Sequence, residues 1–336
     1  MKRLVVGLFA AAMSVGIGLG SASAIEIRLG DWQSTTHIVS VEGTQYWMNK
    51  VEDATNGAIT FEHYPAEQAA KSRELLDAVK NGILDAALIG PIYSSDVLPL
   101  NSVVALPGYF SSAAQGTKAL QSMLADGPLK DEMTDAGVVP IFAFVLPPYQ
   151  LLSKNGRIGG PDDWKGLKIR TSGATQAMVA RGLGASGVSV AGPEVYTGVE
   201  RGLLDAVLFP IPSVAGYKLQ EVVDAISTNG AFGSFSFTIV MRKDLYEGLS
   251  QDDKDALAAA GADAAANVAK AQDDSVGELT AQWAADGIVI YQFTDEESAA
   301  INAAISGATD EWIERIGAHN PKAAEVVARF KELNAQ

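Results

Sequence analysis

One ten-residue pattern occurs twice in the chain, and this repeat limits the possible folds more than any other feature. Residues 79–88 read VKNGILDAAL and residues 199–208 read VERGLLDAVL, so the two segments align without a gap. In each copy the end of a helix, a glycine, an aspartate and an apolar strand follow in the same order. Repetition of a whole supersecondary unit predicts two similar α/β lobes.

The elements around each copy also follow the same order. Periodicity predicts a strand, a helix, a strand, a helix and a strand in each half of the chain. In the first half they are expected at 26–29, 39–55, 59–64, 72–81 and 86–89. In the second half they are expected at 167–170, 173–183, 188–190, 194–201 and 206–209. This alternation is typical of an open parallel sheet, and two such lobes leave a cleft between them.

The last third of the chain is predicted to be mainly helical. An alanine-rich stretch, 255–285, fits one long helix, with breaks expected at Gly261 or Gly277. Capping-box patterns at 250–253 and 294–297 mark two helix starts. Strands are expected at 235–241, which would return the chain to the first lobe, and at 288–291; helices are expected at 296–316 and 321–333.

Residues 1–24 have the three parts of a secretory signal. Lys2 and Arg3 are basic, residues 4–19 carry no charge, and the last three residues are small, as a signal peptidase requires. The alternative is a membrane anchor, which needs about 20 apolar residues. The uncharged run is shorter than that, and its glycines lower its apolar character further. We therefore predict export, cleavage after Ala24, and no membrane insertion of the mature protein.

Charge and cysteine content exclude several partners and chemistries. The chain has 40 acidic and 25 basic residues, a net charge of −15, which repels nucleic acid and anionic membranes. It has no cysteine, and so no thiol catalysis, no thiolate metal ligand and no lipid-modified N-terminal cysteine. Without such an anchor, the exported protein is expected to diffuse freely in a periplasm.

Three further patterns fit structural roles better than functional ones. GLGASG at 182–187 has the glycine spacing of a dinucleotide site, but it ends a helix and precedes a strand, the reverse of what that site needs. The three histidines lack zinc-site spacing, so neither a metal nor a cofactor is expected. Asp85 and Asp205 repeat at a helix-to-strand turn, where aspartate is a favoured residue.

Arg170 is the strongest single candidate for a binding residue. It ends the strand 167–170, and Ser172 follows where the next helix opens. A guanidinium there can donate two parallel hydrogen bonds to a carboxylate, and a helix N-terminus adds to the preference for an anion. The alternative is a surface arginine paired with one of many acids. A second candidate is the loop 31–37, with Trp32 and His37, which either faces the cleft or serves only in packing.

Several segments together resemble a known family. WKGLKIRT at 164–171, EVYT at 194–197, GLLDA at 202–206 and YPAEQ at 64–68 are similar to solute receptors of the tripartite ATP-independent periplasmic (TRAP) transporters, in the DctP-type dicarboxylate-receptor group. The resemblance spans nearly all of the mature chain. It implies a two-lobed periplasmic binding protein fold, type II-like, with a ligand cleft between the lobes and a long C-terminal helix backing both.

The resemblance also implies boundaries and a function. Lobe I would hold residues 25–148 and about 235–275, and lobe II residues 149–234 and about 276–336. No reaction occurs in this family, so the protein would not be an enzyme. The cleft closes on an organic acid, whose carboxylate is clamped by the arginine that Arg170 matches. The closed receptor then delivers the acid to membrane permease subunits driven by an ion gradient.

Two positions depart from the family pattern. Phe209 stands before Pro210 where many members have asparagine, and Tyr149 aligns with a second arginine of some members. Both changes exchange polar contacts for aromatic ones. We therefore predict a ligand with one carboxylate and an apolar or ring-shaped body; a sugar acid remains open, and a small dicarboxylate such as succinate is disfavoured. From the first lobe, contacts are expected from Trp32, His37 and Tyr93.

Two rival functions stay open on the sequence alone. An exported hydrolase or lyase with an arginine-anchored substrate would need a base near Arg170, and His37 is the only obvious candidate. A binding protein of an ATP-driven importer is the nearer rival. The neighbouring genes would distinguish such an importer from a TRAP system, because a TRAP system requires two integral-membrane proteins and no ATPase.

Overall fold

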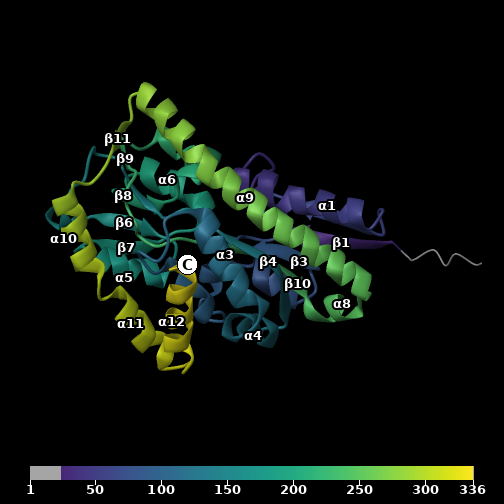
Figure 1. The fold of residues 1–336 in the computed structure, drawn as a ribbon. Coiled ribbons are helices and arrows are strands. Elements are labelled where there is room, and N and C mark those ends of the chain that lie inside the picture. Colours follow the sequence, from purple (N-terminus) through teal and green to yellow (C-terminus); the bar gives the residue numbers. More distant parts are fainter. Residues whose placement is uncertain (1–23, 336) are drawn as a thin grey trace, which may run out of the picture.

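The computed structural model describes residues 24–335 and shows an α/β protein built on two sheets (Figure 1). The first sheet has the order β2 (Ile59–Tyr64), β1 (Ile25–Gly30), β3 (Ala86–Ile89), β10 (Ser236–Arg242) and β4 (Val138–Val145). The second has the order β11 (Val289–Tyr291), β9 (Ala225–Ser227), β5 (Gln150–Ser153), β8 (Ala206–Phe209), β6 (Lys168–Thr171) and β7 (Ser186–Ser189). Each sheet with its helices forms one lobe, lobe I and lobe II. The predicted signal lies almost wholly outside the described residues, so its cleavage after Ala24 stays a prediction.

Both sheets are mixed, not purely parallel as the strand–helix alternation predicted. β1 pairs in parallel with β2 and β3, and β6 pairs in parallel with β7 and β8, which confirms the repeated units. Each sheet also takes in one antiparallel strand, β10 in lobe I and β5 in lobe II. These strands begin where the chain enters from the other lobe, at the edge where the parallel strands end, and therefore run against them.

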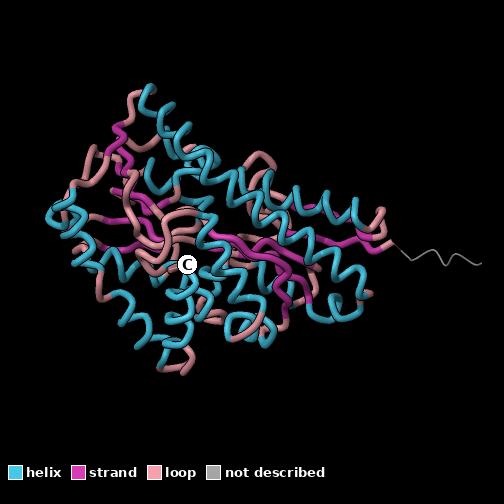
Figure 2. The backbone as a smooth tube through the Cα atoms, in the orientation of Figure 1, coloured by secondary structure: helices cyan, strands magenta, loops and turns pink. Residues whose placement is uncertain are grey.

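Helices and loops cover the two sheets (Figure 2). In lobe I the helices are α1 (Tyr46–Ala54), α2 (Leu75–Lys80), α3 (Ala113–Ala125), α4 (Pro128–Asp135) and α8 (Lys243–Gly248). In lobe II they are α5 (Ala174–Gly182), α6 (Val195–Glu200) and α7 (Ile211–Val214). A π-helical segment, Ser40–Gln45, opens the helix predicted at 39–55. α5 ends at the glycine-rich segment 182–187 and β7 begins within it, so these glycines form a turn, as predicted.

The repeated ten-residue pattern builds the same turn in each lobe. Gly82 and Gly202 have φ of +72° and +69°, in the left-handed region that glycine adopts at little cost. The Asp85 carboxylate accepts a hydrogen bond from the backbone N–H of Arg28 at 3.1 Å, and the Asp205 carboxylate accepts one from that of Lys168 at 2.8 Å. Each aspartate therefore ties its turn to the neighbouring parallel strand, which supports the structural interpretation over a catalytic one.

One long helix and two short crossings join the lobes. α9 (Gln251–Ala285) runs unbroken along both lobes, without the break predicted at Gly261 or Gly277 (Figure 1). A Cβ at Gly261 would come within 2.9 Å of the Phe142 Cβ and 3.1 Å of its ring, so glycine here permits close packing on β4. The crossing segments 146–149 and 228–235 are hydrogen-bonded to each other, with Tyr149 N 2.8 Å from the carbonyl oxygen of Gly233.

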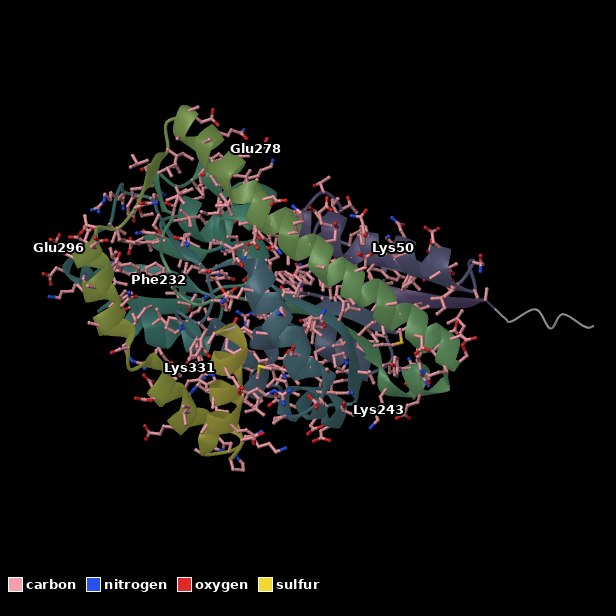
Figure 3. All side chains as sticks on the ribbon, in the orientation of Figure 1. Lys50, Phe232, Lys243, Glu278, Glu296 and Lys331 are labelled. Atoms are coloured by element: carbon pink, nitrogen blue, oxygen red, sulfur yellow. The ribbon has the colours of Figure 1, made fainter. Side chains whose placement is uncertain are left out.

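The interior and exterior of the molecule separate as expected for a globular protein. Figure 3 shows Lys50 and Glu278 on the outside, whereas Phe232 lies inside. Phe232 belongs to a crossing segment, is fully buried, and packs on Trp164 and Phe293 with ring centroids 5.2 and 6.0 Å away. Phe232 therefore anchors its crossing segment in the apolar core of lobe II.

The C-terminal helices link the lobes again. The helix predicted at 296–316 is two helices, α10 (Asp295–Ile305) and α11 (Ala308–Gly317), which pack on α5 of lobe II. α12 (Ala323–Asn334) packs instead on α3 of lobe I, where Phe330 meets Tyr109 and Phe110 and where Arg329 pairs with Asp126. α12 also packs on α11, so it lies between the two lobes, and the expected assignment of about 276–336 to lobe II stays a prediction. Within residues 24–335, no helix combines the length and apolar character of a membrane span.

Candidate ligand site between the lobes

A small cavity lies between the lobes, at the carboxyl ends of the central strands. The space inside it is about 10 Å³, roughly the room that one water molecule needs. Open α/β sheets bind ligands at this position. The cavity wall consists of Trp32, Gln33, Tyr93, Leu146, Tyr149, Arg170, Gly192, Phe209, Ser213, Tyr217, Phe235 and Phe237.

Arg170 places a buried positive charge in this wall. It is 1% exposed; its Nε donates to the carbonyl oxygen of Val190 at 2.9 Å, and Nη1 to that of Leu208 at 3.1 Å. None of the ion pairs among residues 24–335 involves Arg170, so it has no acidic partner in the described chain. A buried charge without a counter-charge is costly, so this position favours an anion.

Aromatic rings make up most of the remaining wall. The ring of Phe209 lies 5.1 Å from the Arg170 guanidinium and 6.2 Å from the ring of Tyr149. On the lobe I side, Trp32 packs against Tyr93 and Phe237, with 5.3 Å between ring centroids in each case. Such rings offer apolar faces to a ligand body while leaving its charged end to the guanidinium.

The hydroxyls of the wall tyrosines stay protonated. Burial raises the pKa of Tyr93 and of Tyr149, although the positive charge of Arg170 opposes the effect, and burial raises the pKa of Tyr217 well above its usual value. Each hydroxyl can therefore donate a hydrogen bond at neutral pH.

Polar contacts across the cavity hold the lobes together. The Tyr217 hydroxyl of lobe II donates to Oε1 of Gln33 in lobe I at 2.8 Å. The Gly192 N–H of lobe II donates to the Tyr93 hydroxyl of lobe I at 3.0 Å. Outside the cavity wall, the exposed Arg73 of lobe I donates to the Ser189 hydroxyl of lobe II at 3.1 Å. The structure therefore shows the lobes closed on each other.

Five of the predicted binding residues line the cavity: Trp32, Tyr93, Tyr149, Arg170 and Phe209. Ser172 does not, because its hydroxyl donates to Oε1 of Gln176 at 2.7 Å.

His37 also lies outside the cavity wall. It packs on Tyr217 with ring centroids 5.2 Å apart, and its Nδ1 accepts from the Val39 N–H at 3.1 Å. Burial lowers the pKa of His37 to about 4, which keeps the ring neutral at ordinary pH. The loop 31–37 was predicted either to face the cleft or to serve only in packing. Trp32 faces the cleft, whereas His37 serves in packing.

Sequence reasoning missed several wall residues. Gln33 lies in the loop 31–37, from which only Trp32 and His37 were predicted as candidates. Phe235 and Phe237 lie on the strand predicted at 235–241, and their spacing of two residues could have indicated that both face the cavity. Ser213 and Tyr217 follow β8 without a local signal. Within residues 24–335, no cluster of His, Cys, Asp and Glu side chains has the arrangement of a metal site.

Comparisons with known proteins agree on one family. The family model of the bacterial extracellular solute-binding protein, family 7 (DctP), matches residues 32–315. The C4-dicarboxylate-binding periplasmic protein DctP of Rhodobacter capsulatus is 26% identical and is matched over 100% of both chains.

Solved structures share the fold. A TRAP solute binding protein from Rhodoferax ferrireducens, in complex with benzoate, superimposes with a TM-score of 0.85 at 22% identity, covering 93% of this chain and 98% of that one. A marine metagenome TRAP solute binding protein specific for aromatic acid ligands, in complex with 3-hydroxybenzoate, gives a TM-score of 0.86 at 23% identity with coverage of 93% and 98%. The chain therefore belongs to the bacterial extracellular solute-binding protein family 7, the solute receptors of TRAP transporters.

Proposed function

We propose that this receptor binds an organic acid with one carboxylate and an apolar or ring-shaped body. The observation that carries the proposal is Arg170, a buried guanidinium without an acidic partner among the described residues, in a largely aromatic cavity. A ligand carboxylate would supply the missing counter-charge and accept two parallel hydrogen bonds. The rings of Phe209, Tyr149 and Trp32 would then pack against the ligand body.

The number of cations in the wall favours a single carboxylate. Arg170 is the one basic side chain among the wall residues, and burying a second, unpaired carboxylate would be costly. Arg73 comes near the wall, but its guanidinium lies over the Tyr93 ring, 4.7 Å from the centroid, and is not part of the wall. Benzoate and 3-hydroxybenzoate, bound by two structural neighbours, are therefore better models for the ligand than the C4-dicarboxylates of the Rhodobacter capsulatus relative.

Ligand binding would be coupled to closure of the lobes. Arg170 and Phe209 belong to lobe II, whereas Trp32 and Tyr93 belong to lobe I, so a bound acid contacts both. Because the closed cavity has only about 10 Å³, the lobes have to part to admit such an acid. An acid that then contacts both lobes shifts the population toward a ligand-bound closed form. The closed receptor would hand its acid to the membrane permease subunits of a TRAP system, in the periplasm after cleavage of the predicted signal.

The hydrolase or lyase alternative gains no support from the site. His37, the base that it requires, packs against Tyr217 and does not line the cavity. TRAP membership also separates the chain from binding proteins of ATP-driven importers.

Isothermal titration of the purified protein with benzoate, mandelate, glucuronate and succinate tests the proposal. We expect a ring-bearing monocarboxylate to bind at least about tenfold tighter than succinate, since the cavity pairs only one carboxylate. Arg170→Met should weaken this binding by about 10²–10⁴-fold. Arg181→Met, which changes an exposed arginine of α5 paired with Glu311 of α11, should leave it unchanged. Tighter binding of succinate than of every ring-bearing acid would overturn the proposal.

A further inference from the structure

Two hydrogen-bond donors in the cavity wall have no acceptor. The indole Nε1 of Trp32 and the amide Nε2 of Gln33 are buried without a partner among the described residues. Both side chains line the cavity and are only 4% and 1% exposed. Buried polar groups are normally paired, so two orphan donors in one wall indicate that a ligand supplies the acceptor.

Gln33 is held in place by three hydrogen bonds. Its backbone N–H donates to the Asp31 carboxylate at 2.7 Å, and its carbonyl oxygen accepts from the Ala66 N–H at 2.8 Å. Its Oε1 accepts from the Tyr217 hydroxyl at 2.8 Å, which leaves Nε2 as the free end of the amide. A donor that is already fixed loses little freedom when a ligand binds, and so discriminates well.

The orphan donors and the cation belong to different lobes. Trp32 and Gln33 follow β1 in lobe I, whereas Arg170 is on β6 in lobe II. The guanidinium takes the carboxylate, because it alone among the wall residues carries a charge that can pair with it. The neutral amide and indole suit a neutral oxygen instead. A ligand with both groups would bridge the two lobes and favour their closed arrangement.

We propose, building on the proposed function, that Gln33 together with Trp32 forms a second polar subsite that selects a hydroxyl or keto oxygen on the ligand. The preferred substrates are then aromatic monocarboxylates that carry such an oxygen on the ring or beside the carboxylate, and unsubstituted benzoate is a poorer ligand. Benzoate leaves both donors unpaired in the closed cavity, and a site built to hydrogen-bond an oxygen discriminates against the analogue that lacks it.

The affinity ratio between oxygenated and plain ligands tests this subsite. Isothermal titration would compare benzoate with 3-hydroxybenzoate, 4-hydroxybenzoate and mandelate in the wild type and in Gln33→Met, a change of similar size that removes the donor. In the wild type, the best oxygenated acid should bind at least about tenfold tighter than benzoate. In Gln33→Met that ratio should fall below about threefold, whereas the loss of the hydrogen bond from Tyr217 to Oε1 should lower the affinity for benzoate and for the oxygenated acids alike.

Gln272→Met is the matched control, because Gln272 is also a fully buried glutamine without an amide partner, but lies on α9 outside the cavity wall. It should leave the ratio at its wild-type value. A wild type that binds benzoate as tightly as the oxygenated acids overturns the subsite, whether or not the variant folds, and so does an unchanged ratio in folded Gln33→Met. Failure of all four acids to bind would overturn the proposed function as well, which distinguishes the two failures.

Discussion

Replacing Arg170 by methionine should separate ligand binding from stability. The change removes the buried charge and its hydrogen bonds to the carbonyl oxygens of Val190 and Leu208, while keeping an unbranched apolar chain in the cavity wall. In most proteins the loss of a buried, hydrogen-bonded arginine is strongly destabilising. Here the absence of an acidic partner among the described residues changes the balance, because no opposite charge is left behind unpaired.

Opposing contributions set the size of the effect. Two hydrogen bonds from a charged donor contribute about 3–6 kcal/mol together. Relief from burying a guanidinium without a counter-charge offsets several kcal/mol of that loss. The free energy of unfolding of the ligand-free protein should therefore change by less than about 2 kcal/mol. A bound carboxylate, in contrast, would lose two charge-assisted hydrogen bonds, and affinity should fall by about 10²–10⁴-fold.

Urea unfolding followed by circular dichroism, with and without the best-binding acid, measures both effects. The expected result is similar unfolding curves for ligand-free wild type and Arg170→Met, with stabilisation by ligand in the wild type only. A variant that loses much more than about 4 kcal/mol of stability, yet binds ligand as the wild type does, would refute the assignment of Arg170 as the anion site.

Three further predictions concern parts of the fold outside the cavity wall. The pKa of His37 is lowered to about 4, against about 6.5 in the unfolded chain, so the unfolded state binds more protons between these values. The free energy of unfolding should thus fall by about 3 kcal/mol as pH drops from 6.5 to 4, and denaturant titrations should show a flatter profile for His37→Gln. Asp205→Ala removes the acceptor for the Lys168 N–H and should lower the free energy of unfolding by about 1 kcal/mol without changing ligand affinity in calorimetry. Gly233→Ala should destabilise by more than about 2 kcal/mol in thermal melts, because φ is +83° and the added Cβ would meet the Ala105 carbonyl oxygen at 2.1 Å.

The repeated units could be predicted from the sequence because the residues that determine each turn and strand are close together in the chain. The glycine and aspartate of each ten-residue copy act within one turn, and the strands beside them are continuous apolar runs. Arg170 and Phe209 were predictable because both lie at the end of a predicted strand, where ligands bind in open α/β sheets.

Features that depend on distant partners were harder to predict. The sheets were expected to be parallel, but β10 and β5 pair with strands that are far away in the sequence. The unbroken α9 depends on the fit of Gly261 against Phe142, whereas glycine alone favours a break. Tyr217 packs on Phe209 in lobe II and contacts Gln33 and His37 of lobe I, so its place in the wall depends on residues far away in the sequence.

The position of a bound carboxylate tests the central claim most directly. A crystal structure of the receptor with its best-binding aromatic acid should place both carboxylate oxygens about 2.7–2.9 Å from guanidinium nitrogens of Arg170, with the ring between Phe209 and Trp32. A ligand whose carboxylate pairs with another cation, or which binds outside this cavity, would contradict the account.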